Sequence, residues 1–111
     1  MEEFTTLWSR EELKAYILLY CAYANFIETE TEKEYIKSKV GEEKYKKIHK
    51  EFDDDNDYQR IQKIQATVER FNYSKNEIDR LFESIKKMFL TDGSIDILEE
   101  NIYRGLQHLL K

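Results

Sequence analysis

The sequence predicts an all-α protein that folds as one compact bundle of about six helices. The chain contains no proline and only three glycines, so it lacks the usual turn punctuation of an all-β fold. Apolar residues recur at the three- and four-residue spacing of amphipathic helices along most of the chain. One helical pattern also occurs twice at a fixed offset, which indicates how the bundle is built.

The repeated pattern covers Ala15–Ile36 and Phe82–Tyr103, at a constant offset of 67 residues. In each copy an apolar helix leads into a short polar turn and then into a helix with an acidic first turn. The offset aligns Leu18 with Ile85, Cys21 with Met88, Asn25 with Asp92, Thr29 with Asp96, and Glu32 with Glu99. We therefore expect two helical hairpins, related by a pseudo-twofold axis, around one shared core.

Composition limits the size and the setting of the protein. At 111 residues and 41% hydrophobic content the chain can bury one core, so residues 1–111 are treated as a single domain. Cys21 is the single cysteine and lies in an apolar run, which favours a reducing, cytoplasmic compartment. That run, Ala15–Ala24, has about half the length needed to span a bilayer, and the acidic N-terminus lacks a signal-peptide pattern. A net charge of −5 argues against nucleic acid as the partner.

The first three helices follow from caps and apolar spacing. The capping box Ser9–Glu12 begins a helix over Arg10–Ala24, which is apolar over most of its circumference and therefore central. A second capping box, Thr29–Glu32, begins a helix that ends before Gly41. A third helix is predicted over Glu42–Phe52, with lysines on one side and apolar residues on the other.

The acidic run Asp53–Asp57 interrupts this pattern and is predicted to be a turn and a cap. Its alternating acids resemble those of a calcium-binding EF-hand loop. However, Tyr58 and Ile64 occupy the positions where that loop requires glycine and a bidentate glutamate. The run is therefore interpreted as an acidic turn, followed by a fourth helix over Tyr58–Phe71.

Two further helices complete the bundle. Ser74–Glu77 is a capping box for the fifth helix, and Asp96–Glu99 opens the last one. Gly105 in the last helix is expected to permit a close approach of another backbone. The residues of this helix predicted to face inward are Leu98, Ile102, Gly105, Leu106 and Leu109.

Acidic residues gather in the turn of the second repeat, where Asp92, Asp96 and Glu99 surround Gly93. Calcium and similar hard cations need about six oxygen ligands, which a loop entering a helix can supply. If the two repeat turns face each other, Glu28 or Glu32 joins this set. We therefore predict Asp92, Asp96, Glu99 and Glu32 as candidate ligands of a divalent cation. Helix capping explains the same residues without a metal.

Aromatic and basic residues indicate a candidate protein-binding surface. Tyr16, Tyr20 and Tyr23 recur along the first helix and cannot all point into one core, so a tyrosine is expected at the edge of a groove. The lysine-rich third helix can either dock a charged partner or form a solvated face. The predicted partner-binding residues are Tyr16, Tyr23, Lys44 and Lys47.

Catalysis finds little support in the sequence. His49 and His108 stand apart from any pattern of metal ligands or nucleophiles. The apolar neighbours of Cys21 are expected to raise the pKa of its thiol and make it inert. No glycine-rich phosphate loop is present. We therefore expect a protein without enzymatic activity.

Two segments, Leu18–Glu32 and Phe89–Glu99, together resemble the TerB-like family. These small helical domains are named from bacterial tellurite-resistance operons and also occur at the front of a membrane-anchored DnaJ-type co-chaperone. The family typically shows a helix rich in small residues, then Asp-Gly, an apolar residue, and a Glu seven positions after the Asp. The second copy matches at Asp92, Gly93, Ile95 and Glu99, whereas the first has Asn25, Phe26 and Glu28 and keeps Glu32.

The resemblance implies an all-helical domain with two related halves and an acidic surface that can hold a metal, associated with stress response. We accordingly expect a cytoplasmic protein-interaction module linked to stress or tellurite response. The alternative is a domain that binds or senses a divalent cation through its acidic turns, and no other cofactor is expected. We further expect an unidentified protein partner, no nucleic acid, no membrane span, and a monomer or weak homodimer.

Overall fold

The computed structural model describes residues 6–23, 29–93 and 95–110, and within these ranges it contains helices and no strand. This confirms the predicted all-α class. The elements are α1 (Arg10–Ala22), α2 (Glu30–Val40), α3 (Glu42–Asp54), α4 (Asp57–Phe71), α5 (Lys75–Phe89), the short 3-10 helix η2 (Leu90–Asp92) and α6 (Ile97–Leu110).

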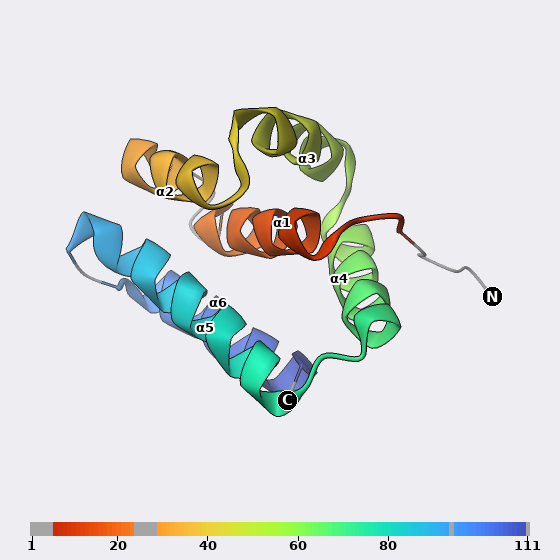
Figure 1. The fold of residues 1–111 in the computed structure, drawn as a ribbon. Helices are drawn as coiled ribbons and strands as arrows, with labels where there is room; N and C mark the ends of the chain where they lie inside the picture. The colour runs from red at the N-terminus through yellow and green to blue at the C-terminus, as the bar shows by residue number, and fades with distance from the viewer. Residues whose placement is uncertain (1–5, 24–28, 94, 111) are drawn as a thin grey trace.

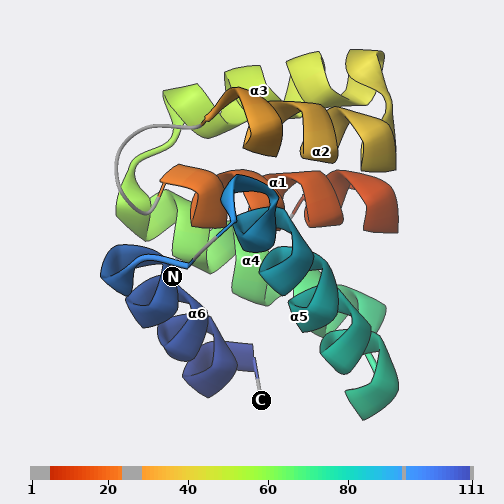
Figure 2. The same cartoon turned by 90° about the vertical axis from the view of Figure 1, so that its left-hand side faces the viewer.

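The apolar helix α1 lies at the centre of the fold. It contacts each of the other five α-helices of the described chain. Figures 1 and 2 show α2 and α3 on one side of α1, and α4, α5 and α6 around the other. Eight of its thirteen residues are buried, which is why a helix apolar nearly all round is stable here. The predicted central position of the first helix is confirmed.

Helix starts are the best-predicted local features. The boxes at Ser9–Glu12, Thr29–Glu32, Ser74–Glu77 and Asp96–Glu99 all form, each with reciprocal bonds between side chain and backbone. A further box at Asn56–Gln59 begins α4 and was not predicted.

Helix ends differ from the prediction at two places. Ala24, the predicted end of the first helix, lies outside the described residues, and α1 ends at Ala22. Helix α3 continues to Asp54 and α4 begins at Asp57, so three of the five residues of the predicted acidic turn are helical. The connection to α4 shortens to Asp55 and Asn56. Two bonds from the Arg60 guanidinium to the carbonyl oxygen of Phe52, 2.8 and 3.1 Å long, hold the last turn of α3 on α4.

The inward face predicted for the last helix is only partly correct. Leu106 is buried, but Leu98 is 46% exposed and Gly105 is exposed as well. A Cβ atom placed on Gly105 would meet no heavy atom within 4 Å, so no backbone approaches it closely. The physical reason is that the main contacts of α6 are with α1, α4 and α5, which leave part of its surface uncovered.

The two repeats occupy neighbouring places. Helices α1 and α5 are in contact, as expected for hairpins that share a core, and α2 also contacts both α5 and η2. The Thr91 hydroxyl donates a 3.4 Å hydrogen bond to Oγ1 of Thr31, which joins the second turn to the start of α2. The pseudo-twofold relation itself remains a prediction.

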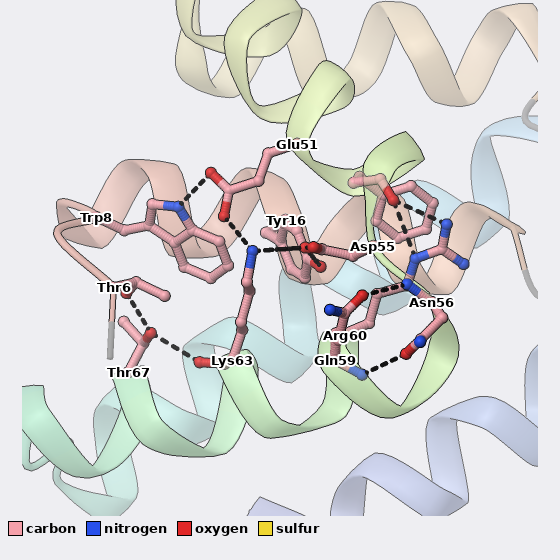
Figure 3. Close-up of polar contacts among 11 residues, drawn as sticks. Thr6, Trp8, Tyr16, Glu51, Asp55, Asn56, Gln59, Arg60, Lys63 and Thr67 are labelled. Carbon is pink, nitrogen blue, oxygen red and sulfur yellow. Dashed lines mark hydrogen bonds and ion pairs between the residues drawn. The ribbon is translucent and has the colours of Figure 1, made fainter. Parts of the chain in front are cut away.

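A polar cluster ties the N-terminal segment to α1, α3 and α4 (Figure 3). The Lys63 ammonium lies 2.9 Å from Oε2 of Glu51 and 2.8 Å from Oδ2 of Asp55. Glu51 also accepts a 3.1 Å bond from the indole of Trp8, while Asp55 accepts from Tyr16. Because each buried polar group has a partner, the cluster can lie beside the core without a large desolvation penalty.

None of the described helices combines the length and the apolar character needed to cross a membrane.

Candidate functional site

An uncharged hollow of about 330 Å³ lies between α4 and α6, next to Tyr20 of α1. It results from the incomplete cover of α6, whose apolar stripe extends beyond the neighbouring helices. The residues that line it are Tyr20, Ile61, Leu98, Asn101, Ile102, Gly105, Leu106 and Leu109.

A second hollow of about 460 Å³ lies next to the first, toward α3. The two share Tyr20 and Ile102 and are together called the apolar trough. The second hollow is lined by Tyr20, Tyr23, Phe52, Asp53, Asp57, Arg60 and Ile102. The trough is thus apolar along α6 and has charged residues only at its α3–α4 end.

Helical spacing explains why one side of α6 forms the wall of the trough. Leu98, Ile102 and Leu109 are separated by four and seven positions, so they share one face of the helix. Ile97, next to Leu98 in the chain, is 73% exposed and adds apolar surface at the start of α6. Exposed aliphatic side chains around a hollow are typical of surfaces that a partner covers.

Tyr23 lies on the wall of the trough, held by hydrogen bonds and ring contacts. Its hydroxyl is 3.2 Å from Nε2 of His49, and Nδ1 of His49 is 3.0 Å from Oδ2 of Asp53. Its ring centroid lies 5.2 Å from that of Phe52. His49, isolated in the sequence, therefore joins a Tyr–His–Asp chain. These contacts hold the Tyr23 ring at the edge of the trough. A tyrosine was expected at the edge of a groove.

Tyr20 is the second aromatic side chain of the trough and comes from the same helix. It is half-buried. Burial raises the pKa of its phenol, and the carboxylate of Asp57 raises it further. The phenol therefore stays neutral at physiological pH and presents a ring with one polar tip.

The other three predicted partner-binding residues lie away from the trough. Tyr16 is fully buried in the core, so its side chain is not at the surface where it was predicted. Lys44 and Lys47 are exposed on α3 and form ion pairs with residues of α1. Lys44 pairs with Glu11 at 2.5 Å, and Lys47 pairs with Glu12 at 3.0 Å. Tyr16 is enclosed because its position on α1 faces both Trp8 and Phe52.

Three of the four predicted metal ligands lie at two helix starts. Glu32 is 1% exposed and accepts a 3.0 Å bond from the backbone N–H of Thr29. Glu99 is 5% exposed and accepts an equivalent 3.0 Å bond from Asp96. Asp96 itself is exposed and caps α6. Asp92 belongs to η2, and its side chain lies outside the described part of the structure.

Both buried glutamates influence the same thiol. Burial raises the pKa of Cys21, and the nearby carboxylates of Glu32 and Glu99 raise it further. The thiol is therefore protonated and unreactive, as predicted. Within the described ranges no three His, Cys, Asp or Glu side chains are grouped so that they could hold a metal ion.

Sequence reasoning missed the trough because it placed the whole apolar stripe of the last helix in the core. A signal was present in the pair Ile97-Leu98, which precedes the capping residue Glu99. Adjacent residues on a helix point about 100° apart, so both could not face the same core. The contribution of Ile61 depends on how α4 crosses α6, which no local pattern encodes.

Comparison of the chain with protein-family models, with curated proteins and with solved structures gave no match. Its fold and surface define an all-α domain with an apolar trough and two buried capping glutamates. The resemblance to the TerB-like family therefore rests on the motif residues of the sequence alone.

Proposed function

We propose that this protein is an interaction module that binds an amphipathic helix of a partner protein in the apolar trough. The observation that carries the proposal is the uncharged hollow along α6, lined by Leu98 and Ile102, with a second hollow next to it that shares Tyr20 and Ile102. Helix-in-groove recognition places the apolar face of one helix into such a hollow, with anchors spaced three, four and seven residues apart.

Charge distribution supports an apolar occupant. Charged residues make up 37% of the chain, yet none lines the part of the trough between α4 and α6. A partner helix would therefore cover this part without desolvating a charged group. Desolvation of charges is the main electrostatic penalty of association.

The aromatic residues of α1 supply the expected anchors. Tyr20 lines both hollows, and Tyr23 lines the second hollow, toward α3. Tyrosines that lose little side-chain freedom on binding are common hot spots of protein interfaces. Because Tyr23 is already held by His49 and Phe52, its ring is ordered before a partner arrives.

Site-specific photo-crosslinking in cells of the source organism tests this proposal. A photoreactive residue at position 98 should crosslink one defined protein, and the substitution Asn101→Arg on the rim should abolish that product. Asn76→Arg, an equally exposed change in α5, is the matched control and should leave it unchanged. Binding of the crosslinked segment, as a synthetic helix, is then measured directly.

The proposal fails if position 98 yields no crosslinked product, or if Asn76→Arg and Asn101→Arg change the amount of that product equally. Crosslinks between two copies of this chain would indicate self-association through the trough and would also contradict a foreign partner helix. A link to stress or tellurite response rests on the TerB-like resemblance and is tested by the identity of the crosslinked protein.

A second candidate function is the binding of a divalent cation near the starts of α2 and α6. The supporting observation is that two nearly buried carboxylates, Glu32 and Glu99, both lie close enough to act on Cys21. Buried carboxylates supply the oxygen ligands that calcium prefers. Calorimetry with calcium, on the natural protein and on a Glu32→Gln, Glu99→Gln double variant, tests this candidate. An equal response of both proteins would exclude these ligands.

A further inference from the structure

We infer that a cleft between α1 and α5, on a different surface from the trough, binds the phosphate group of a small phosphate monoester. The cleft has a volume of about 290 Å³, which is enough for a small ligand. Its lining residues are Arg10, Glu11, Lys14, Tyr73, Glu77, Arg80, Leu81 and Ser84. This inference is independent of the proposed protein interaction.

The acidic residues of the cleft are already engaged by other cations. Glu11 receives the Lys44 ammonium at 2.5 Å, and Glu77 forms an ion pair with Arg10. Across the described ranges, Lys14 and Arg80 form no ion pair of their own. The cleft therefore presents two cations, from α1 and α5, without a bound carboxylate to neutralise them.

The surroundings of Lys14 strengthen this imbalance. The side chain is half-buried, and burial lowers the pKa of its ammonium. Lys39 of α2 lowers that pKa further, Glu11 opposes it with a smaller effect, and Lys87 of α5 adds the smallest lowering. Like charges in a partly desolvated site repel each other, and a bound anion reduces that repulsion.

The kinds of donor that line the cleft favour a phosphate over a simple carboxylate. Arg80 carries a planar fork of N–H donors that matches two phosphate oxygens, and Ser84 adds a hydroxyl on the same face of α5. The Arg10 guanidinium lies 4.9 Å from the Tyr73 ring centroid and 5.2 Å from that of Phe71, which fixes one wall of the cleft. A dianionic group with several oxygens can use the cations of both helices at once.

Calorimetric titration of the full chain with inorganic phosphate tests the site. Lys14→Met and Arg80→Gln should each weaken phosphate binding by about tenfold or more, since each removes a hydrogen bond to a charged group. Lys50→Gln is the matched control, because Lys50 is an exposed lysine of α3 outside the cleft. If Lys14→Met fails to fold, the exposed Arg80 gives the decisive variant.

A second measurement follows Lys14 itself. With lysines labelled by ¹³C-methylation, the Lys14 resonance should titrate at a lower pH than those of exposed lysines, and phosphate should raise its pKa. Absence of phosphate binding, or an equal loss in Lys50→Gln, would overturn the site. Acetate that binds as tightly as phosphate would show a general anion patch and overturn the phosphate assignment.

Discussion

The Tyr16 hydroxyl donates a 2.6 Å hydrogen bond to Oδ2 of Asp55, which lies 39 residues further along the chain. Tyr16 belongs to the central helix α1, whereas Asp55 is the C-cap of α3. The same carboxylate lies 2.8 Å from the ammonium of Lys63 on α4. One side chain at a two-residue connection therefore holds three helices together (Figure 3).

Removal of this carboxylate should destabilise the fold strongly. We expect Asp55→Ala to lower the free energy of unfolding by about 2–4 kcal/mol, because it leaves the Tyr16 hydroxyl and the partly buried Lys63 with fewer partners. Urea unfolding followed by the fluorescence of Trp8, which is buried in the same cluster, measures the change.

The neighbouring acid provides the control for this prediction. Asp54 is exposed at the end of α3, so Asp54→Ala should change the free energy of unfolding by no more than about 0.5 kcal/mol. Equal effects of the two substitutions would show that the Asp55 contacts do not stabilise the native state.

The Lys63 contacts predict a pH dependence at the alkaline end. Burial alone would lower the pKa of Lys63, but its bonds to Asp55 and Glu51 outweigh burial and hold this pKa above the ordinary lysine value. The folded protein then keeps a proton that the unfolded chain loses, so this stabilisation is complete below the ordinary lysine pKa. It is lost as the pH rises through the higher, folded value.

Urea unfolding at neutral pH and at several pH values above about 10 tests the sign. Stability should fall more steeply with pH in the natural protein than in Lys63→Gln. Lys75→Gln, which changes an exposed lysine, should keep the slope of the natural protein. A steeper fall in Lys63→Gln would contradict the raised pKa.

The repeat aligns Leu18 with Ile85, and both side chains are fully buried. Replacement of either by alanine should therefore lower the free energy of unfolding by about 2–5 kcal/mol. Leu90, which is 50% exposed, serves as the control, and Leu90→Ala should have a much smaller effect. Losses below about 1 kcal/mol at both buried positions would show that the repeats do not share a core.

Local features of the fold were predictable because they depend on short-range chemistry. The capping boxes at Thr29–Glu32 and Asp96–Glu99 need only residues three apart, and both formed as predicted. Gly93 ends η2 in the left-handed conformation for the same reason. The central position of α1 was predictable because this helix is apolar around most of its circumference. Contact with one neighbouring helix could not bury all of that surface.

Features that depend on tertiary contacts were not predictable from patterns. Nothing in the run Asp53–Asp57 distinguishes Asp55, which is paired with Lys63, from its exposed neighbours. Tyr16 and Tyr23 are similar in sequence context, yet one is buried and the other lines the trough. The crossing of α4 over α6 decides which apolar residues of α6 stay uncovered, and so decides the candidate site.

Gly105 offers a test that separates stability from binding. It lies in the interior of α6, and an added Cβ would meet nothing within 4 Å. Gly105→Ala should therefore raise the free energy of unfolding by about 0.5–1 kcal/mol, because alanine loses less backbone freedom than glycine in a helix. Thermal unfolding measures this gain.

The same methyl group would protrude into the apolar trough, which Gly105 lines. We therefore expect Gly105→Ala to weaken the binding of the partner helix even though it stabilises the free protein. A surface that only affects folding would respond in the opposite way, since a more stable domain would bind at least as well. Unchanged or tighter binding by Gly105→Ala would place the partner elsewhere on the molecule.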